Sequence, residues 1–131
     1  FPFTVIGNPL LKGKYSFSFV PQSIRGMSET PLFMNDTCYG IDLRDYDINI
    51  LLREKKINIQ WLKEMYNAYP HKEKFFDHTQ SREIGNVDSR TGDSNFKEQI
   101  KQGVSEEDIR KSWEPGLGNY KQMRMKYLLY P

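Results

Sequence analysis

The chain has 131 residues, 27% of them charged, and a net charge of +2, which are ordinary values for one globular domain. Its charges are spread evenly without a basic stripe, so a nucleic-acid-binding surface is not expected. The single cysteine excludes an internal disulfide bond, and no apolar run approaches the roughly 18 residues of a membrane span.

The first third of the sequence predicts strands. In residues 14–20, KYSFSFV, aromatic side chains alternate with serines, which is the period-two pattern of a half-buried strand. Residues 38–46, CYGIDLRDY, alternate in the same way, and residues 1–7, FPFTVIG, form a shorter third candidate. The connection 21–37 is long for a compact domain, and loops of that kind are often functional.

From about residue 45 the apolar spacing becomes helical. Residues 47–56 predict a short helix, and residues 58–69 predict a longer one that starts at Asn58 as N-cap and stops at Pro70. Residues 71–92 are polar and almost without periodicity, so we expect them to form mostly loop.

The last third predicts further helices that close the core. Residues 95–103 form one helix with Gly103 after its last turn, and Ser105 caps the next. Pro115 is expected to begin a separate closing helix, because proline is favoured in the first helical turn. An apolar stripe continues from one helix into the other, so the tail YLLYP is predicted to dock in the core. The stripe comprises Ile109, Trp113, Leu117, Tyr120, Met123 or Arg124, and Tyr127.

The order of these elements predicts the fold class. Strands come first and helices follow without alternating, which is typical of an α+β fold rather than a wound parallel sheet. We therefore expect residues 1–131 to form one domain, in which a small, mainly antiparallel sheet packs against three to four helices. Because the chain begins FPF without an initiator methionine, we expect it to be a fragment or a processed product of a longer protein.

Few residues suggest catalysis or metal binding. His71 and His78 lack the spacing of a zinc motif and are expected to be solvated, and the glycines match no phosphate-binding loop, so no metal or cofactor is predicted. Cys38 at a strand start is interpreted as a small buried hydrophobe rather than a nucleophile. Independent glycoside hydrolysis would need two nearby carboxylates, although acidic groups are usual at a solvated strand end. The best candidates for such a pair are Asp42, Asp45 and Asp47.

The long connection carries the sharpest local signal of a binding site. It mixes hydrogen-bond donors with apolar and aromatic side chains, as the rim of a sugar-binding site does. The alternative is an ordinary crossing loop whose methionines and Phe33 tuck beneath it. The residue types alone leave both interpretations open. The candidate residues are Arg25, Met27, Met34, Asn35 and Tyr39.

Several stretches together resemble one bacterial family. PFTVIGNPLL, then FVPQS and the loop into NDTCYGIDLRD, then GVSEEDIRKSW and YLLYP are similar to the C-terminal domain of the NamZ-type exo-β-N-acetylmuramidases. The resemblance spans Phe1 to Pro131 and is weakest over residues 71–92. Its most specific parts are Cys38-Tyr39-Gly40 and the pattern from Ile109 to Tyr130.

The resemblance implies an accessory role in a larger enzyme. Such enzymes release terminal N-acetylmuramic acid from peptidoglycan fragments, with catalytic glutamates in an N-terminal Rossmann-like domain, so no catalytic residue is expected among residues 1–131. The loop 24–39, with Cys38 and Tyr39, would face the substrate cleft and that catalytic domain. The implied partners are therefore the catalytic domain and muropeptides or MurNAc-GlcNAc sugars.

Two further expectations accompany this resemblance. Because the substrate is a cell-wall fragment, the resemblance implies a periplasmic or secreted protein, although no signal is visible in these residues. The alternative function is a stand-alone carbohydrate- or protein-binding module. A parent gene without an upstream Rossmann-like half would favour that alternative.

Overall fold

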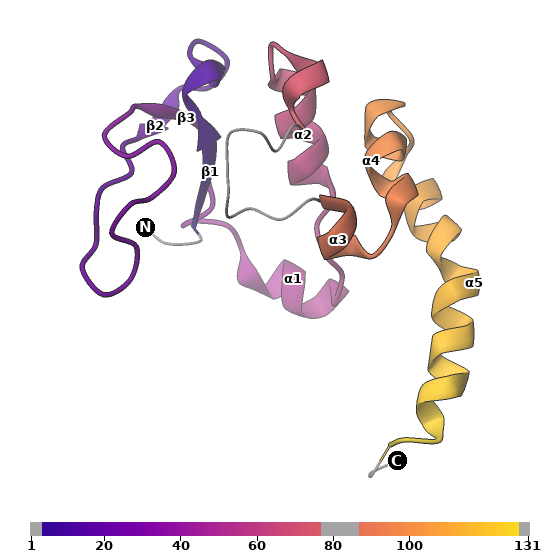
Figure 1. Cartoon of the computed structure of the whole chain (residues 1–131). Coiled ribbons are helices and arrows are strands. Elements are labelled where there is room, and N and C mark those ends of the chain that lie inside the picture. Colours follow the sequence, from indigo (N-terminus) through magenta and orange to yellow (C-terminus); the bar gives the residue numbers. More distant parts are fainter. Residues whose placement is uncertain (1–3, 77–86, 129–131) are drawn as a thin grey trace.

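The computed structural model describes residues 4–76 and 87–128, where a small sheet comes first and helices follow (Figure 1). The predicted α+β class with an antiparallel sheet is confirmed. The strands are β1 (Val5–Asn8), β2 (Phe17–Phe19) and β3 (Cys38–Asp42). The helices are α1 (Ile48–Glu54), α2 (Gln60–Ala68), α3 (Val87–Thr91), α4 (Ser94–Lys101) and α5 (Glu106–Met125), with the short 3-10 helices η1 (Pro9–Leu11) and η2 (Lys72–Lys74).

The sheet is built around its central strand. Its order is β1-β3-β2, and both pairings are antiparallel. Gly40 of β3 lies opposite Gly7 of β1 on one side and Phe17 of β2 on the other. A Cβ atom at position 40 would lie 1.9 Å from the backbone oxygen of Ile6, so the strands can approach this closely only because that residue is glycine.

A hydrophobic core lies among the helices rather than on the sheet. Side chains of α2, α4 and α5 meet there, because the helical spacing of the core residues places them on the sides of these helices that face one another. Trp113 and Leu62 pack against the margin of this core. The buried members are Ile59, Tyr66, Phe76, Phe96, Ile100 and Ile109.

The helix ends follow the predicted capping residues. Ser105 Oγ accepts a hydrogen bond from the backbone N–H of Asp108 at 3.1 Å, as an N-cap does. Gly103 has a φ of 73° just beyond α4, the left-handed conformation that a helix C-terminus requires. The α2 helix begins one residue later than predicted, yet Asn58 Oδ1 still accepts from the backbone N–H of Trp61 at 3.2 Å.

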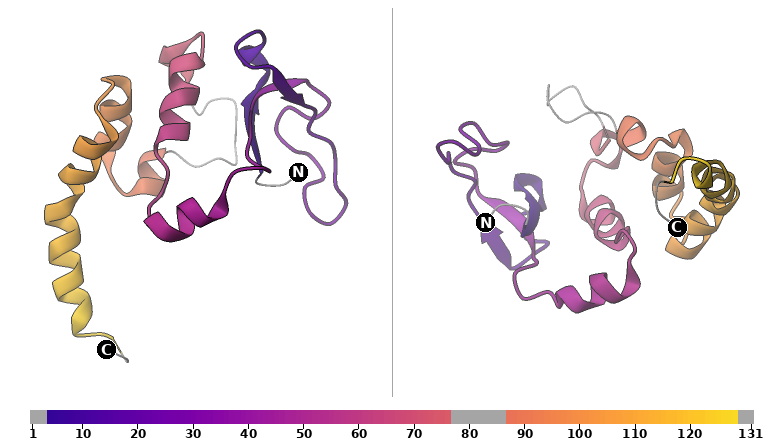
Figure 2. Two further views of the ribbon diagram at one scale, coloured as in Figure 1. Left: turned by 180° about the vertical axis from the view of Figure 1, so that it is seen from behind. Right: turned by 90° about the horizontal axis from the view of Figure 1, so that it is seen from below.

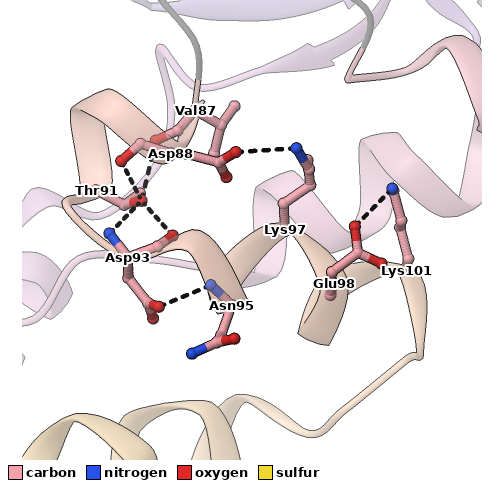
Figure 3. A network of polar contacts seen from close by, with 8 residues as sticks. All are labelled: Val87, Asp88, Thr91, Asp93, Asn95, Lys97, Glu98 and Lys101. Carbon is pink, nitrogen blue, oxygen red and sulfur yellow. Dashed lines mark hydrogen bonds and ion pairs between the residues drawn. The ribbon is translucent and has the colours of Figure 1, made fainter.

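The corner between α3 and α4 was not predicted, because α3 lies within the stretch 71–92 that was expected to be loop. Polar contacts define this corner (Figure 3): Lys97 Nζ donates to Asp88 Oδ2 at 2.9 Å. Asp93 caps α4 by accepting from the backbone N–H of Asn95 at 2.8 Å. Its other carboxylate oxygen accepts from the indole N–H of Trp113 at 3.1 Å, which connects this corner to the first half of α5.

Helix α5 is continuous, so the predicted break at Pro115 is wrong. Proline removes only one backbone donor, and its own φ is compatible with a helix. Pro115 is exposed, on the side of α5 away from Ile109, so water can satisfy the carbonyl group that loses its partner.

The prediction that the tail packs into the core is also wrong. In Figure 1 and in the left view of Figure 2, the second half of α5 projects beyond the other described elements, so none of these elements covers its apolar stripe. Tyr120 is 53% exposed and Tyr127 is 77% exposed. Residues 129–131, the end of YLLYP, lie outside the described residues.

Candidate functional site

A cleft of about 420 Å³ lies between the sheet and α2. This volume is within the range of small-molecule sites in proteins. Its walls come from β1 and η1 on one side and from α2 and the turn after η2 on the other. The described lining residues are Ile6, Gly7, Asn8, Leu11, Asn58, Trp61, Leu62, Met65, Tyr69 and Phe75.

Two asparagines supply amide groups to this cleft, whose other lining residues are mostly apolar or aromatic. Asn8 Oδ1 accepts from the backbone N–H of Leu10 at 2.9 Å and so caps η1. Asn58 Oδ1 is used in the same way at the start of α2. Because each amide oxygen faces a backbone donor, the amide NH2 group of each residue points elsewhere and has no partner among the described residues. Because both asparagines line the cleft, their amide NH2 groups are candidate hydrogen-bond donors to a ligand oxygen.

The aromatic side chains of the cleft are held by neighbouring rings. Trp61 meets Tyr46 edge to face, with ring centroids 5.2 Å apart. Phe75 lies 5.3 Å from the ring of Tyr69 and 5.4 Å from that of Tyr66, again edge to face. Such contacts restrict side-chain rotation, so the aromatic surface is formed before any ligand arrives.

A hydrogen bond connects the sheet side of the molecule to α2. The phenol of Tyr15 donates to Glu64 Oε1 at 3.1 Å, over 49 residues of sequence. Partial burial and this carboxylate raise the pKa of Tyr15 to about 12. The phenol consequently remains protonated at any pH at which the chain would be used, and the link persists.

The loop between β2 and β3 holds four of the predicted site residues, Arg25, Met27, Met34 and Asn35, and all four are exposed. None of them lines the cleft, and neither do Cys38 and Tyr39 on β3. Their role in substrate binding stays a prediction. Met27 is 65% exposed, so the alternative in which the methionines tuck beneath the loop is not what the structure shows.

This loop has a defined backbone. The N–H of Asn35 donates to the carbonyl of Pro21 at 2.9 Å and closes the base, while Ile24 and Ser28 pair at the tip. Phe33 and Asn35 have φ values of 58° and 67°, in the left-handed region that side chains other than asparagine rarely adopt. Strained residues of this kind are concentrated at functional sites.

The cleft was not predicted from the sequence, because the patterns around the lining residues already indicate structural roles for them. Asn58 was predicted as an N-cap, and residues 58–69 as a single helix with one apolar spacing. The structure shows that α2 has two apolar faces. Ile59 and Tyr66 face the helical core, whereas Trp61 and Met65 face the cleft. The available signal was Trp61, which lies about 160° around the helix from Ile59 and widens the apolar surface beyond one stripe.

The family model described as "Exo-beta-N-acetylmuramidase NamZ, C-terminal" matches residues 1–130. The chain belongs to this NamZ C-terminal family. The peptidoglycan beta-N-acetylmuramidase NamZ of Bacillus subtilis (strain 168) is 28% identical over 142 residues, which cover 98% of this chain and 32% of that protein. The likeness extends to three dimensions. A crystal structure of a DUF1343 family protein from Bacteroides fragilis matches with a TM-score of 0.76 and 27% identity, over 98% of this chain and 34% of that one.

This NamZ C-terminal chain thus spans about a third of the length of these relatives. The family membership confirms the resemblance seen in the motifs from PFTVIG to YLLYP. Among the described residues, no helix is both long and apolar enough to span a bilayer. The same residues contain no group of three or more His, Cys, Asp or Glu side chains placed to hold a metal ion.

Cys38 is buried in the sheet of this NamZ family member, with 1% of its surface exposed. Burial, with a smaller contribution from the charge of Asp36, raises the pKa of the thiol. The thiolate that would act as a nucleophile is therefore disfavoured at neutral pH. This environment favours the interpretation of Cys38 as a small buried hydrophobe.

We expect Cys38 to resist alkylation. Iodoacetamide should react with it about 100-fold more slowly than with free cysteine at pH 8, because reaction needs an opening of the sheet as well as ionisation. Mass spectrometry over a time course would measure the rate. In urea the rate should rise to that of free cysteine, and an equally fast reaction in the native chain would contradict the burial.

Two of the three candidate aspartates, Asp42 at the end of β3 and Asp47 before α1, have structural partners. Arg44 donates to both carboxylate oxygens of Asp42, from Nε at 2.9 Å and from Nη2 at 2.5 Å. Asp47 Oδ1 caps α1 by accepting from the backbone N–H of Asn49 at 2.9 Å. These contacts account for Asp42 and Asp47 without a catalytic role, and neither residue lines the cleft.

The pKa of Asp42 gives a direct test of its pairing. Hydrogen bonds from the Arg44 side chain, and then from its backbone N–H, lower this pKa to about 2. Because the folded-state pKa is depressed, the stabilisation is complete above the unfolded value of roughly 4 and is lost as pH falls through about 2. NMR titration of the carboxyl carbon should show this midpoint, and Arg44→Ala should return it toward 4. A midpoint near 4 in the native chain would contradict the pairing.

Proposed function

We propose that this chain is the non-catalytic, substrate-cleft-forming part of a peptidoglycan-recycling glycoside hydrolase that releases terminal N-acetylmuramic acid. The observation that carries the proposal is the cleft between β1 and α2, which combines aromatic walls with the free amide donors of Asn8 and Asn58. Apolar and aromatic surfaces with a few placed polar groups are the usual composition of ligand sites. The family match supports the class of substrate.

The chemistry of the cleft fits binding rather than hydrolysis. Hydrolysis of a glycosidic bond commonly requires two carboxyl groups on either side of it. The described residues that line the cleft include no Asp, Glu, His or Cys. A sugar could place its apolar ring face on Trp61 and direct its acetamido or lactyl oxygens to the two asparagines. The reacting carboxylates would come from the N-terminal part of the parent enzyme.

The loop 24–39 is a second candidate part of the substrate cleft in this proposal. Its exposed side chains Arg25, Met27, Met34 and Asn35, with the half-buried Tyr39 at its end, would face the catalytic part across the substrate. We further propose that the parent enzyme acts in the periplasm or outside the cell, because its substrate is a fragment of the cell wall. The chain alone should not hydrolyse a muramide, and turnover at the parent's rate would contradict the proposal.

The asparagines allow a substitution that separates capping from ligand binding. Aspartate is as good a helix cap as asparagine but lacks the NH2 group. In the parent enzyme, Asn8→Asp or Asn58→Asp should raise KM for a muramic-acid-terminated disaccharide about ten-fold, with kcat little changed, because a ground-state hydrogen bond is lost.

Asn67→Asp is the matched control, because Asn67 lies on α2, is exposed and does not line the cleft. It introduces the same charge, and KM should stay at the parent value. Unchanged KM in both cleft variants would remove the cleft from the proposal. In that case the loop 24–39 is tested next, by following the Met27 and Met34 methyl signals as the disaccharide is added.

A further inference from the structure

The apolar stripe of α5 is buried at one end of the helix and exposed at the other. Ile109 has 0% of its surface exposed, and Trp113 packs on Phe96 with ring centroids 5.8 Å apart. At 100° per residue, Leu117 and Tyr120 fall on the same side of the helix as Ile109 and Trp113. Both are about half exposed. The stripe is therefore one continuous surface, of which the described chain covers only the first half.

Local propensity alone does not account for the exposed half of α5. Pro115, Gly116 and Gly118 lie inside the helix, where proline costs about 3 kcal/mol and each glycine about 1 kcal/mol relative to alanine. A helix that begins its exposed half with these residues needs packing on another surface to be stable. Figures 1 and 2 show no other described element beside it.

We infer that the second half of α5 docks on the N-terminal part of the parent enzyme, through Leu117, Tyr120 and Met123. The relatives supply the reason for this partner, because about two-thirds of their length lies outside the region that this chain matches. The first half of the stripe packs against α2 and α4. Docking of the second half would continue this contact onto the N-terminal part of the same polypeptide.

The charges around the stripe indicate the character of the opposing surface. Lys121, Arg124 and Lys126 lie on the last two turns and just after them, and none has an ion pair with a described residue. The opposing surface should therefore be an apolar groove with acidic side chains at its rim. The inference rests on the proposed function, since it takes the partner to be the rest of a larger enzyme.

Hydrogen exchange in the parent enzyme tests the docking of α5 without substrate or turnover. A negative result would therefore contradict the docking and would not bear on the proposed function of the cleft. The amides of residues 117–125 should exchange at least about 100-fold more slowly than those of an unstructured peptide of the same sequence. Exchange at the unstructured rate in the unmodified parent would overturn the inference. This measurement needs no variant and so does not depend on the folding of one.

Tyr120→Glu should remove this protection, with exchange about 50-fold faster, because a charge is placed within the apolar contact. Gln122→Glu is the matched control, since Gln122 lies on the opposite side of α5 and the charge change is the same; its protection should remain. The amides of Ile100 and Ile109 should stay protected in both variants and report an intact fold.

Equal protection of residues 117–125 in both variants would overturn the inference. A parent dimer that Tyr120→Glu converts to a monomer in light scattering would assign the stripe to a second copy instead, and would also overturn it.

Discussion

Replacing Gly40 by alanine is expected to destabilise the chain by about 3 kcal/mol, at the upper end of the usual cost of overpacking. The added Cβ would lie 1.9 Å from the backbone oxygen of Ile6 and 2.7 Å from the Cα of Gly7. Both are backbone atoms of the paired strand, so no side-chain rotation can relieve the contact. β1 would have to separate from β3, with loss of their hydrogen bonds. Urea denaturation followed by circular dichroism would measure the change.

Gly118→Ala is the matched control for this substitution. Gly118 lies inside α5, and a Cβ there would meet nothing within 4 Å. Alanine favours a helix by about 1 kcal/mol over glycine, so helical content should rise and stability should not fall. If Gly40→Ala were as well tolerated as Gly118→Ala, the close pairing of β1 and β3 would be wrong.

Ile109→Ala is expected to cost about 3 kcal/mol, because it removes a fully buried side chain and leaves a cavity. Ile109 belongs to the cluster in which α2, α4 and α5 meet, together with Phe96 and Ile100. All three helices therefore lose contacts at once. The midpoint of urea unfolding should fall without a change in its slope.

Leu117→Ala tests the same stripe two turns further along α5. Leu117 is 49% exposed in the described chain, so the same kind of truncation should change the stability of this chain by less than about 0.5 kcal/mol. The two residues differ in burial and hardly at all in chemistry. Equal losses from both substitutions would show that the second half of α5 is packed within this chain.

The local patterns of the sequence predicted most secondary structure. Alternation of apolar and polar residues around Phe17 and Ile41 predicted β2 and β3, because the two faces of a strand meet different environments. Ser105 and Gly103 marked helix ends through chemistry that acts within one turn. Helix α3 was missed because its five residues are mostly polar, and the tertiary contact of Asp88 with Lys97 supports them.

The cleft could not be predicted in the same way. It exists because β1 and α2, about 50 residues apart in sequence, lie on its two sides. Asn8 and Asn58 each precede a helix, and the sequence around each one is typical of a helix N-cap. This local pattern does not indicate the direction of the amide NH2 group, which the cap does not use. The loop candidates Arg25 and Asn35 were selected by residue type. Residue type indicates which interactions a side chain can make, but not where that side chain lies in the fold.

The sequence by itself determined the family, the α+β class and the apolar stripe from Ile109 to Tyr127, since each follows from residue identity and spacing along the chain. Only the tertiary structure decided which part of that stripe is buried. Burial depends on the elements that lie opposite. Phe96 of α4 packs on Trp113, whereas no described element lies beside the second half of α5, and Tyr120 there is 53% exposed. An apolar pattern indicates that burial of a surface would be favourable, and the tertiary structure determines which element, if any, buries it.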